Sequence, residues 1–180
     1  MTHTSIYFKG QTDLNEQMAT FIGNQGAIDF LMEKYGKESQ EVVEAIYHQE
    51  DDLLFSQWID EACQQLSNLY ARGISKEEKI RGREEIFQSI QEEFRKLKVH
   101  FKTDDYKGFE NMNLNNAVLL AYRRYIHRLE IFQALYKYFD NDLRRMIDFF
   151  KKIRTSGEEP SSYLERWMKE KGISVPASLQ

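Results

Sequence analysis

Apolar residues three or four positions apart recur along almost the whole chain, and this spacing predicts α-helices. No segment shows a convincing strand pattern. The expected helices cover about residues 13–35, 39–72, 75–101, 114–138 and 160–172, with a shorter helix capped by Asp140 or Asn141 that ends near 154. We therefore expect an all-α fold of five or six helices. The short turn near Gly73 predicts that the second and third helices form a long antiparallel hairpin, which dominates the fold.

Polar residues mark several of the expected helix starts. Asp13 is followed three positions later by Glu16, and Ser75 is followed at the same spacing by Glu78. Both pairs match the capping box, in which a side chain on each residue hydrogen bonds to the backbone of the other. Ser39 is a further candidate cap. The chain thus carries start signals for its first three long helices.

The composition is that of a globular protein, with 41% hydrophobic and 30% charged residues among 180. We expect one helical domain over residues 1–172 and a loose tail over 173–180. The net charge of -4 gives no general attraction to nucleic acid, and no apolar run is long enough to span a membrane. Cys63 is the only cysteine, so no internal disulfide forms, and it is interpreted as a small core residue.

Few local patterns point to chemistry. His48 and His100 lie in polar parts of long helices and are interpreted as surface residues, whereas His127 could line a cleft but more simply packs. No Gly-rich phosphate loop, Ser/His/Asp set or cysteine cluster occurs. The basic and aromatic residues near 122–128 and 144–154 could bind nucleic acid or a partner helix. The interpretation favoured here is aromatic core residues with cations near helix C-termini. On local pattern alone, His3 is a terminal residue and Glu16 a capping residue.

The order of residues near the start changes this picture. The stretch His-Thr-Ser-Ile-Tyr-Phe-Lys-Gly, followed by Asn-Glu-Gln-Met-Ala-Thr-Phe-Ile-Gly, resembles the active-site region of the bacterial predicted zinc aminopeptidase family. In that family an H-E-x-x-H helix leads through a Tyr-x-Lys-Gly turn into an Asn-Glu-x-x-Ala-x-Phe-x-Gly helix. The segments 69–73 and 114–117, with Tyr125, extend the resemblance, which covers about residues 3–154.

The resemblance implies a role for four residues. His3 would be the second histidine of H-E-x-x-H and Glu16 the third ligand of a zinc ion whose fourth position holds water. That water would hydrolyse a peptide substrate, as in gluzincin peptidases. Asn15 would orient Glu16, and Tyr125 would stabilise the oxyanion.

The first histidine and the glutamate of H-E-x-x-H would occupy the two positions before Met1. We therefore expect this chain to bind zinc weakly and to be inactive. A truncated gene, a mis-assigned start and a decayed paralogue would each explain the pattern. The alternative function is a non-catalytic helical interaction module that kept the scaffold, and a homodimer would cover apolar surface near the first helix. Relatives are often exported or membrane-associated, but the sequence does not indicate a compartment for this chain.

Overall fold

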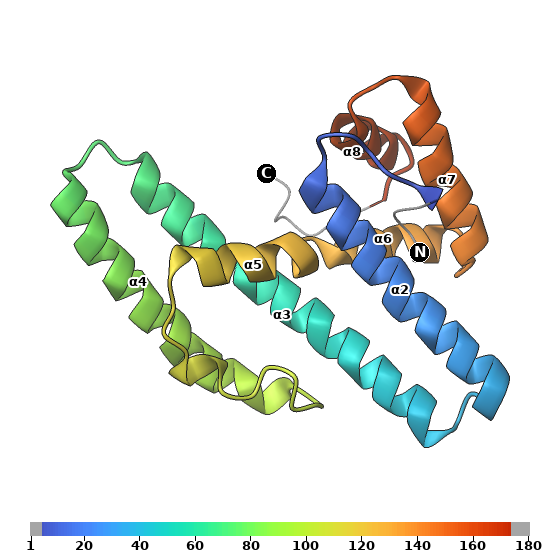
Figure 1. Cartoon of the computed structure of the whole chain (residues 1–180), viewed down its shortest axis with the longest axis horizontal. Coiled ribbons are helices and arrows are strands. Elements are labelled where there is room, and N and C mark those ends of the chain that lie inside the picture. Colours follow the sequence, from blue (N-terminus) through green and yellow to red (C-terminus); the bar gives the residue numbers. More distant parts are fainter. Residues whose placement is uncertain (1–4, 174–180) are drawn as a thin grey trace.

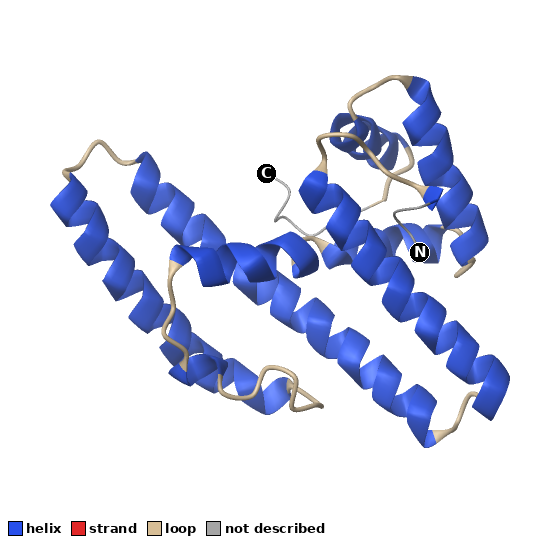
Figure 2. Ribbon diagram, in the orientation of Figure 1, coloured by secondary structure: helices blue, strands red, loops and turns tan. Residues whose placement is uncertain are grey.

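The structure, a computed structural model, describes residues 5–173, and within this range its regular elements are helices alone (Figure 2). The all-α class predicted from the sequence is therefore confirmed. The elements are α2 (Thr12–Tyr35), α3 (Gln40–Ala71), α4 (Lys76–Leu97), the 3₁₀ helices η1 (Lys98–His100) and η2 (Phe109–Asn111), α5 (Asn116–Ile126), α6 (Leu129–Tyr138), α7 (Leu143–Ser156) and α8 (Pro160–Glu170).

The two longest helices, α2 and α3, lie side by side and run in opposite directions (Figure 1). From the turn after α3, α4 runs back toward the other end of the molecule, and near that turn Gly82 packs on Leu69. A Cβ at Gly82 would lie 2.9 Å from Leu69 Cδ1, so the glycine permits the close approach. The helix α5 packs against both α2 and α3, and α6, α7 and α8 gather around the first half of α2.

Two of the predicted helix starts are confirmed. Ser75 and Glu78 form a capping box, in which Glu78 N donates to Ser75 Oγ at 3.2 Å and Ser75 N donates to Glu78 Oε2 at 2.9 Å. Ser39 caps α3 by accepting a hydrogen bond from the backbone of Val42. Each side chain satisfies a donor that lacks a partner within its own helix.

The capping box predicted for the first helix is wrong. The helix α2 begins at Thr12, one residue before Asp13, and no side chain caps the position of Gln11. Asp13 is already inside the first turn, where its charge complements the positive end of the helix dipole. With Gln11 at the N-cap, Glu16 lies beyond the third helical position from which a capping box forms.

The predicted helix 114–138 is two helices, because α5 ends at Ile126 and α6 begins at Leu129. The predicted cap of the next helix is also corrected. Asp140 and Asn141 have φ of 58° and 59° and form the turn, while Asp142 caps α7 by accepting from the next backbone amides. Asparagine and aspartate tolerate this left-handed conformation better than most residues do.

Two hydrophobic clusters form the core. The first cluster joins the start of α2 to α6, α7 and α8, and the aromatic cluster joins α3 and α4 to η2 and α5. In the aromatic cluster, Phe55 stacks on Tyr106 with ring centroids 4.0 Å apart. Ile126 packs against both clusters, so the end of α5 lies between them.

The last described residue, Ile173, donates its amide to Met168 and packs against the first cluster. The rest of the predicted tail, 174–180, lies outside the described residues. None of the helices within residues 5–173 has the length and apolar character needed to cross a membrane.

Candidate functional site

The turn before α2 is fixed by the buried side-chain amide of Asn15. Phe8 N donates to Asn15 Oδ1 at 2.9 Å, and Asn15 Nδ2 donates to the carbonyl of Phe8 at 2.8 Å. Gly10 adopts a positive φ of 81°, which glycine accommodates without steric cost. Asn15 is 1% exposed, so both hydrogen bonds are shielded from water. The proposed effect of Asn15 on Glu16 stays a prediction, whereas its hold on the Tyr-x-Lys-Gly turn is visible.

Glu16 follows on α2 and is partly buried. His3, its expected partner as a metal ligand, lies outside the described residues. Within residues 5–173, no group of three or more His, Cys, Asp and Glu side chains could hold a metal ion. The described residues thus do not make up a metal centre by themselves, and Glu16 as a zinc ligand stays a prediction.

Tyr125 lies on α5 and is 49% exposed. The neighbouring Arg124 places its Nε 3.7 Å from Asp13 Oδ1, so this part of α5 approaches the first turn of α2. Tyr125 itself is accessible to solvent, but it is not among the residues that line the pocket described below. Its role at an oxyanion remains a prediction.

The break between α5 and α6 is held by two buried residues of α3. Asp60 accepts from His127 Nδ1 and from the backbone N of Arg128, the latter at 3.4 Å. Ser56 Oγ accepts from the backbone N of Leu129 at 3.4 Å. These amides open α6 and have no partner within the helix, so α3 supplies the acceptors. Arg128 takes up a left-handed φ of 59° at this point.

The pairing with Asp60 also orients His127. A carboxylate on Nδ1 fixes the proton on that nitrogen and turns Nε2 toward any ligand. The side chains of His127 and Asp60 are 15% and 5% exposed, so the pair is largely shielded from solvent. The result is an imidazole of fixed orientation at the helix break.

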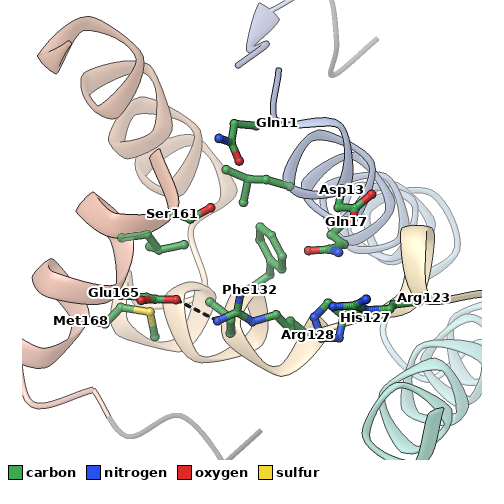
Figure 3. Close-up of a pocket in the computed structure, with 13 residues that line it drawn as sticks. Gln11, Asp13, Gln17, Arg123, His127, Arg128, Phe132, Ser161, Glu165 and Met168 are labelled. Atoms are coloured by element: carbon green, nitrogen blue, oxygen red, sulfur yellow. Dashed lines mark hydrogen bonds and ion pairs between the residues drawn. The ribbon is translucent and has the colours of Figure 1, made fainter. Parts of the chain in front are cut away.

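A pocket of about 160 Å³ opens beside this imidazole (Figure 3). It lies between the first turns of α2, the α5–α6 break and α8. The lining residues are Gln11, Asp13, Leu14, Gln17, Arg123, His127, Arg128, Ile131, Phe132, Ser161, Leu164, Glu165 and Met168. The lining thus combines polar and charged side chains with apolar ones. Glu16 lies three positions after Asp13 and directly before Gln17, so the predicted zinc ligand is on the same turns of α2, although it is not itself a lining residue.

In this pocket, here called the α2–α8 pocket, one arginine forms an ion pair with a described residue and another does not. Arg128 Nη2 donates to Glu165 Oε1 at 3.0 Å, which links the helix break to α8. Arg123, by contrast, has no hydrogen bond or ion pair with any residue that the structure describes, 5–173. The pocket therefore contains one cation whose charge is not already neutralised by a neighbour.

Residues 1–163 match the model of a protein family described as Putative aminopeptidase. The chain belongs to this family. The match confirms the aminopeptidase resemblance drawn from the sequence and covers both the Tyr-x-Lys-Gly turn and the α5–α6 break. No curated protein and no solved structure matches the chain. Within this aminopeptidase-family chain, the α8 residues Leu164, Glu165 and Met168 of the pocket lie beyond the matched range.

The sequence indicated only a small part of this pocket. It allowed His127 to line a cleft but favoured simple packing, and the structure places His127 at the pocket. Asp60 gave no signal, because an aspartate within a long helix is ordinarily a surface residue. His48 lies on the surface and pairs with Asp105, as its polar surroundings indicated. Burial raises the pKa of Cys63 to about 11, so its thiol stays protonated at neutral pH and is no nucleophile.

Proposed function

We propose that this chain forms part of the active site of a zinc-dependent peptidase, of gluzincin type, in which His3 and Glu16 are metal ligands. Two features support the proposal: the chain belongs to the aminopeptidase family, and a polar pocket opens on the turns of α2 that carry Glu16. The second is the deciding observation, because a peptidase needs a pocket for the substrate near its metal.

When bound, zinc would supply a water of lowered pKa and polarise the scissile carbonyl. The residues of the chain itself position the peptide. The α2–α8 pocket holds one side chain of the substrate against Leu14 and Phe132 and excludes water from it. His127, held by Asp60, offers Nε2 to a polar group of the peptide, and Tyr125 offers its hydroxyl from α5.

A polypeptide with the printed sequence is expected to bind zinc weakly and to hydrolyse no peptide. It contains the second histidine of H-E-x-x-H, at His3, but not the first histidine or the glutamate. Two protein ligands leave a zinc ion with too few donors for a stable tetrahedral site, and the glutamate would have been the general base.

Calorimetric zinc titration tests the proposal on two polypeptides: the printed chain, and the same chain preceded by His-Glu so that H-E-x-x-H is complete. We expect the extended chain to bind zinc roughly a hundredfold more tightly, since added ligands raise metal affinity steeply. Glu16→Gln in the extended chain should remove most of this gain. Glu33→Gln, an exposed glutamate on the same helix, is the matched control and should have no effect.

Equal and negligible zinc affinity in both polypeptides would overturn the peptidase proposal. That result would favour the alternative, a helical interaction module without catalysis. One feature supports this alternative: Leu120 is 55% exposed beside a hollow of about 200 Å³, which Tyr70 and Leu119 also line. An exposed apolar surface of this kind is typical of contacts between proteins, including homodimers.

A further inference from the structure

Arg123 lies between the α2–α8 pocket and the hollow beside Leu120, and it lines both. Arg123 lines the pocket and is only partly exposed, yet no described residue in 5–173 forms a hydrogen bond or ion pair with it. Most partly buried arginines are paired, because removing a charge from water is costly without compensation. Arg123 therefore retains hydrogen-bond donors for a ligand in the pocket.

His127 lies one helical turn beyond Arg123 and faces the same pocket (Figure 3). Residues four apart project from the same face of a helix, so the two side chains can act on one ligand group. Asp60 holds Nδ1 of His127, so Nε2 is the ring nitrogen left for the pocket. The guanidinium of Arg123 presents its donors in a planar fork, the geometry that a carboxylate requires.

The acidic residues of the pocket do not cancel this preference. Glu165 is already engaged by Arg128, and Asp13 is paired with Arg124, which is not among the lining residues. Both carboxylates are more than half exposed, at 53% and 58%, so they sit at the solvent side of the pocket. Water screens these exposed carboxylates well. Arg123 is less exposed, so its attraction for a bound carboxylate is screened less.

We propose that the α2–α8 pocket recognises a carboxylate group, with Arg123 as its donor and the oriented imidazole of His127 beside it. The inference rests on the proposed function in that the ligand is taken to be a peptide. The carboxylate belongs either to an aspartate or glutamate side chain or to the C-terminus of a short peptide. The substrate class is therefore an acidic or very short peptide.

The size and lining of the pocket agree with this ligand. At about 160 Å³ it is smaller than the roughly 300–1,000 Å³ of typical small-molecule sites, so it accepts one residue of a peptide. Leu14, Phe132 and Leu164 contribute apolar surface to the same pocket. A short aliphatic stem that ends in a carboxylate matches both surfaces.

Three dipeptides of nearly equal shape test the proposal by calorimetry on the printed chain without metal. Ala-Glu α-amide carries only a side-chain carboxylate, Ala-Gln carries only a C-terminal carboxylate, and Ala-Gln amide carries neither. We expect at least one of the first two to bind roughly tenfold or more tightly than the third, the contribution expected of a charge-assisted hydrogen bond. The tighter of the two identifies the source of the carboxylate. Equal binding of all three, or binding of none, overturns the proposal.

Variants assign the effect to the pocket. Arg123→Met should abolish the preference for the carboxylate, and Arg123→Lys should restore part of it by returning the charge. Arg144→Met is the matched control, because Arg144 is exposed on α7 and lines no part of the pocket. A preference that survives in Arg123→Met, with the fold checked by circular dichroism, contradicts the assignment.

This experiment is independent of the zinc titration. If the chain recognises carboxylates but gains no zinc affinity on extension, the carboxylate proposal stands and the peptidase proposal is wrong. If the extended chain binds zinc but the three dipeptides bind equally, the peptidase proposal stands and the carboxylate proposal is wrong.

Discussion

The buried aspartates Asp51 and Asp60 lie at different places along α3, and each holds a segment that is distant in the sequence. They are 2% and 7% exposed, and each accepts hydrogen bonds from a segment distant in the sequence. Asp51 accepts from Lys102 N, at 2.9 and 3.0 Å to its two oxygens, and from Thr103 N and Oγ1, both at 2.7 Å. It thereby fixes the loop after α4 beside the aromatic cluster.

Asp60 differs in the nature of its partners. It accepts from the backbone of Arg128, but its principal partner is the imidazole of His127, which faces the α2–α8 pocket. Asp51 therefore satisfies neutral donors and closes a structural loop, while Asp60 orients a titratable group at a surface that a ligand can reach. A buried carboxylate such as Asp60 therefore indicates a functional site when its partner is a titratable group that lines a pocket, and a structural contact when, as for Asp51, its partners are backbone amides and a hydroxyl.

The largest effect is expected from Asp51→Ala. The substitution leaves two backbone amides and the Thr103 hydroxyl without an acceptor, and each buried unsatisfied group costs about 1–3 kcal/mol. We expect urea denaturation to show a loss of about 4 kcal/mol in the free energy of unfolding.

Glu50→Ala is the matched control for this prediction. It removes the ion pair with Lys102, in which both side chains are almost half exposed, and should cost less than about 1 kcal/mol. Similar losses in the two variants would contradict the structural role given to Asp51.

Much of the fold could be predicted from the sequence, but the break in the helix 114–138 could not. Ile126, Leu129 and Ile131 keep apolar character through the break, so the local pattern favours a continuous helix. The acceptors that stabilise the broken form come from Ser56 and Asp60, 67 to 73 positions away in the sequence. A tertiary contact of this range overrides local helix propensity.

The same distance limits what could be predicted of the site. The turn before α2 and the family were accessible through residues close in the sequence, such as Asn15 and Gly10. The sequence allowed His127 to line a cleft and placed Arg123 in a basic and aromatic segment, but it did not bring the two together at one pocket. That pocket requires α8, whose Glu165 meets Arg128 only in the folded chain.

A smaller loss of stability, with a local change at the pocket, is expected from Asp60→Ala. The variant removes an acceptor for His127 and for a weak 3.4 Å contact with Arg128, so we expect a loss of about 2 kcal/mol. Nitrogen-15 shifts of the His127 ring should move as well, because nothing then holds the proton on Nδ1.

The exposed neighbour Glu61→Ala is the control, and neither its stability nor the ring shifts should change. If the His127 shifts in Asp60→Ala remain those of the unmodified chain, Asp60 does not position the imidazole, and the distinction from Asp51 fails.

The smallest effect is expected at Asp52, which lies next to Asp51 but is only partly buried. Burial raises the pKa of Asp52 above its usual 3.8, although hydrogen bonds from Tyr106 and Asn24 oppose the shift. The folded chain thus binds this proton more tightly than the unfolded chain does. The stabilising contribution of Asp52 is complete below pH 3.8 and is lost as the pH rises through the folded-state pKa.

Asp52→Asn removes this dependence, so the stability of the variant relative to the unmodified chain should increase as the pH rises above 3.8. Urea denaturation at a series of pH values measures the difference. Asp104→Asn, whose side chain is 83% exposed, should show no such trend and serves as the control. A difference that falls with pH would mean that the hydrogen bonds from Tyr106 and Asn24 outweigh burial. Asp52 would then resemble Asp51, as a carboxylate that the fold stabilises in its charged form.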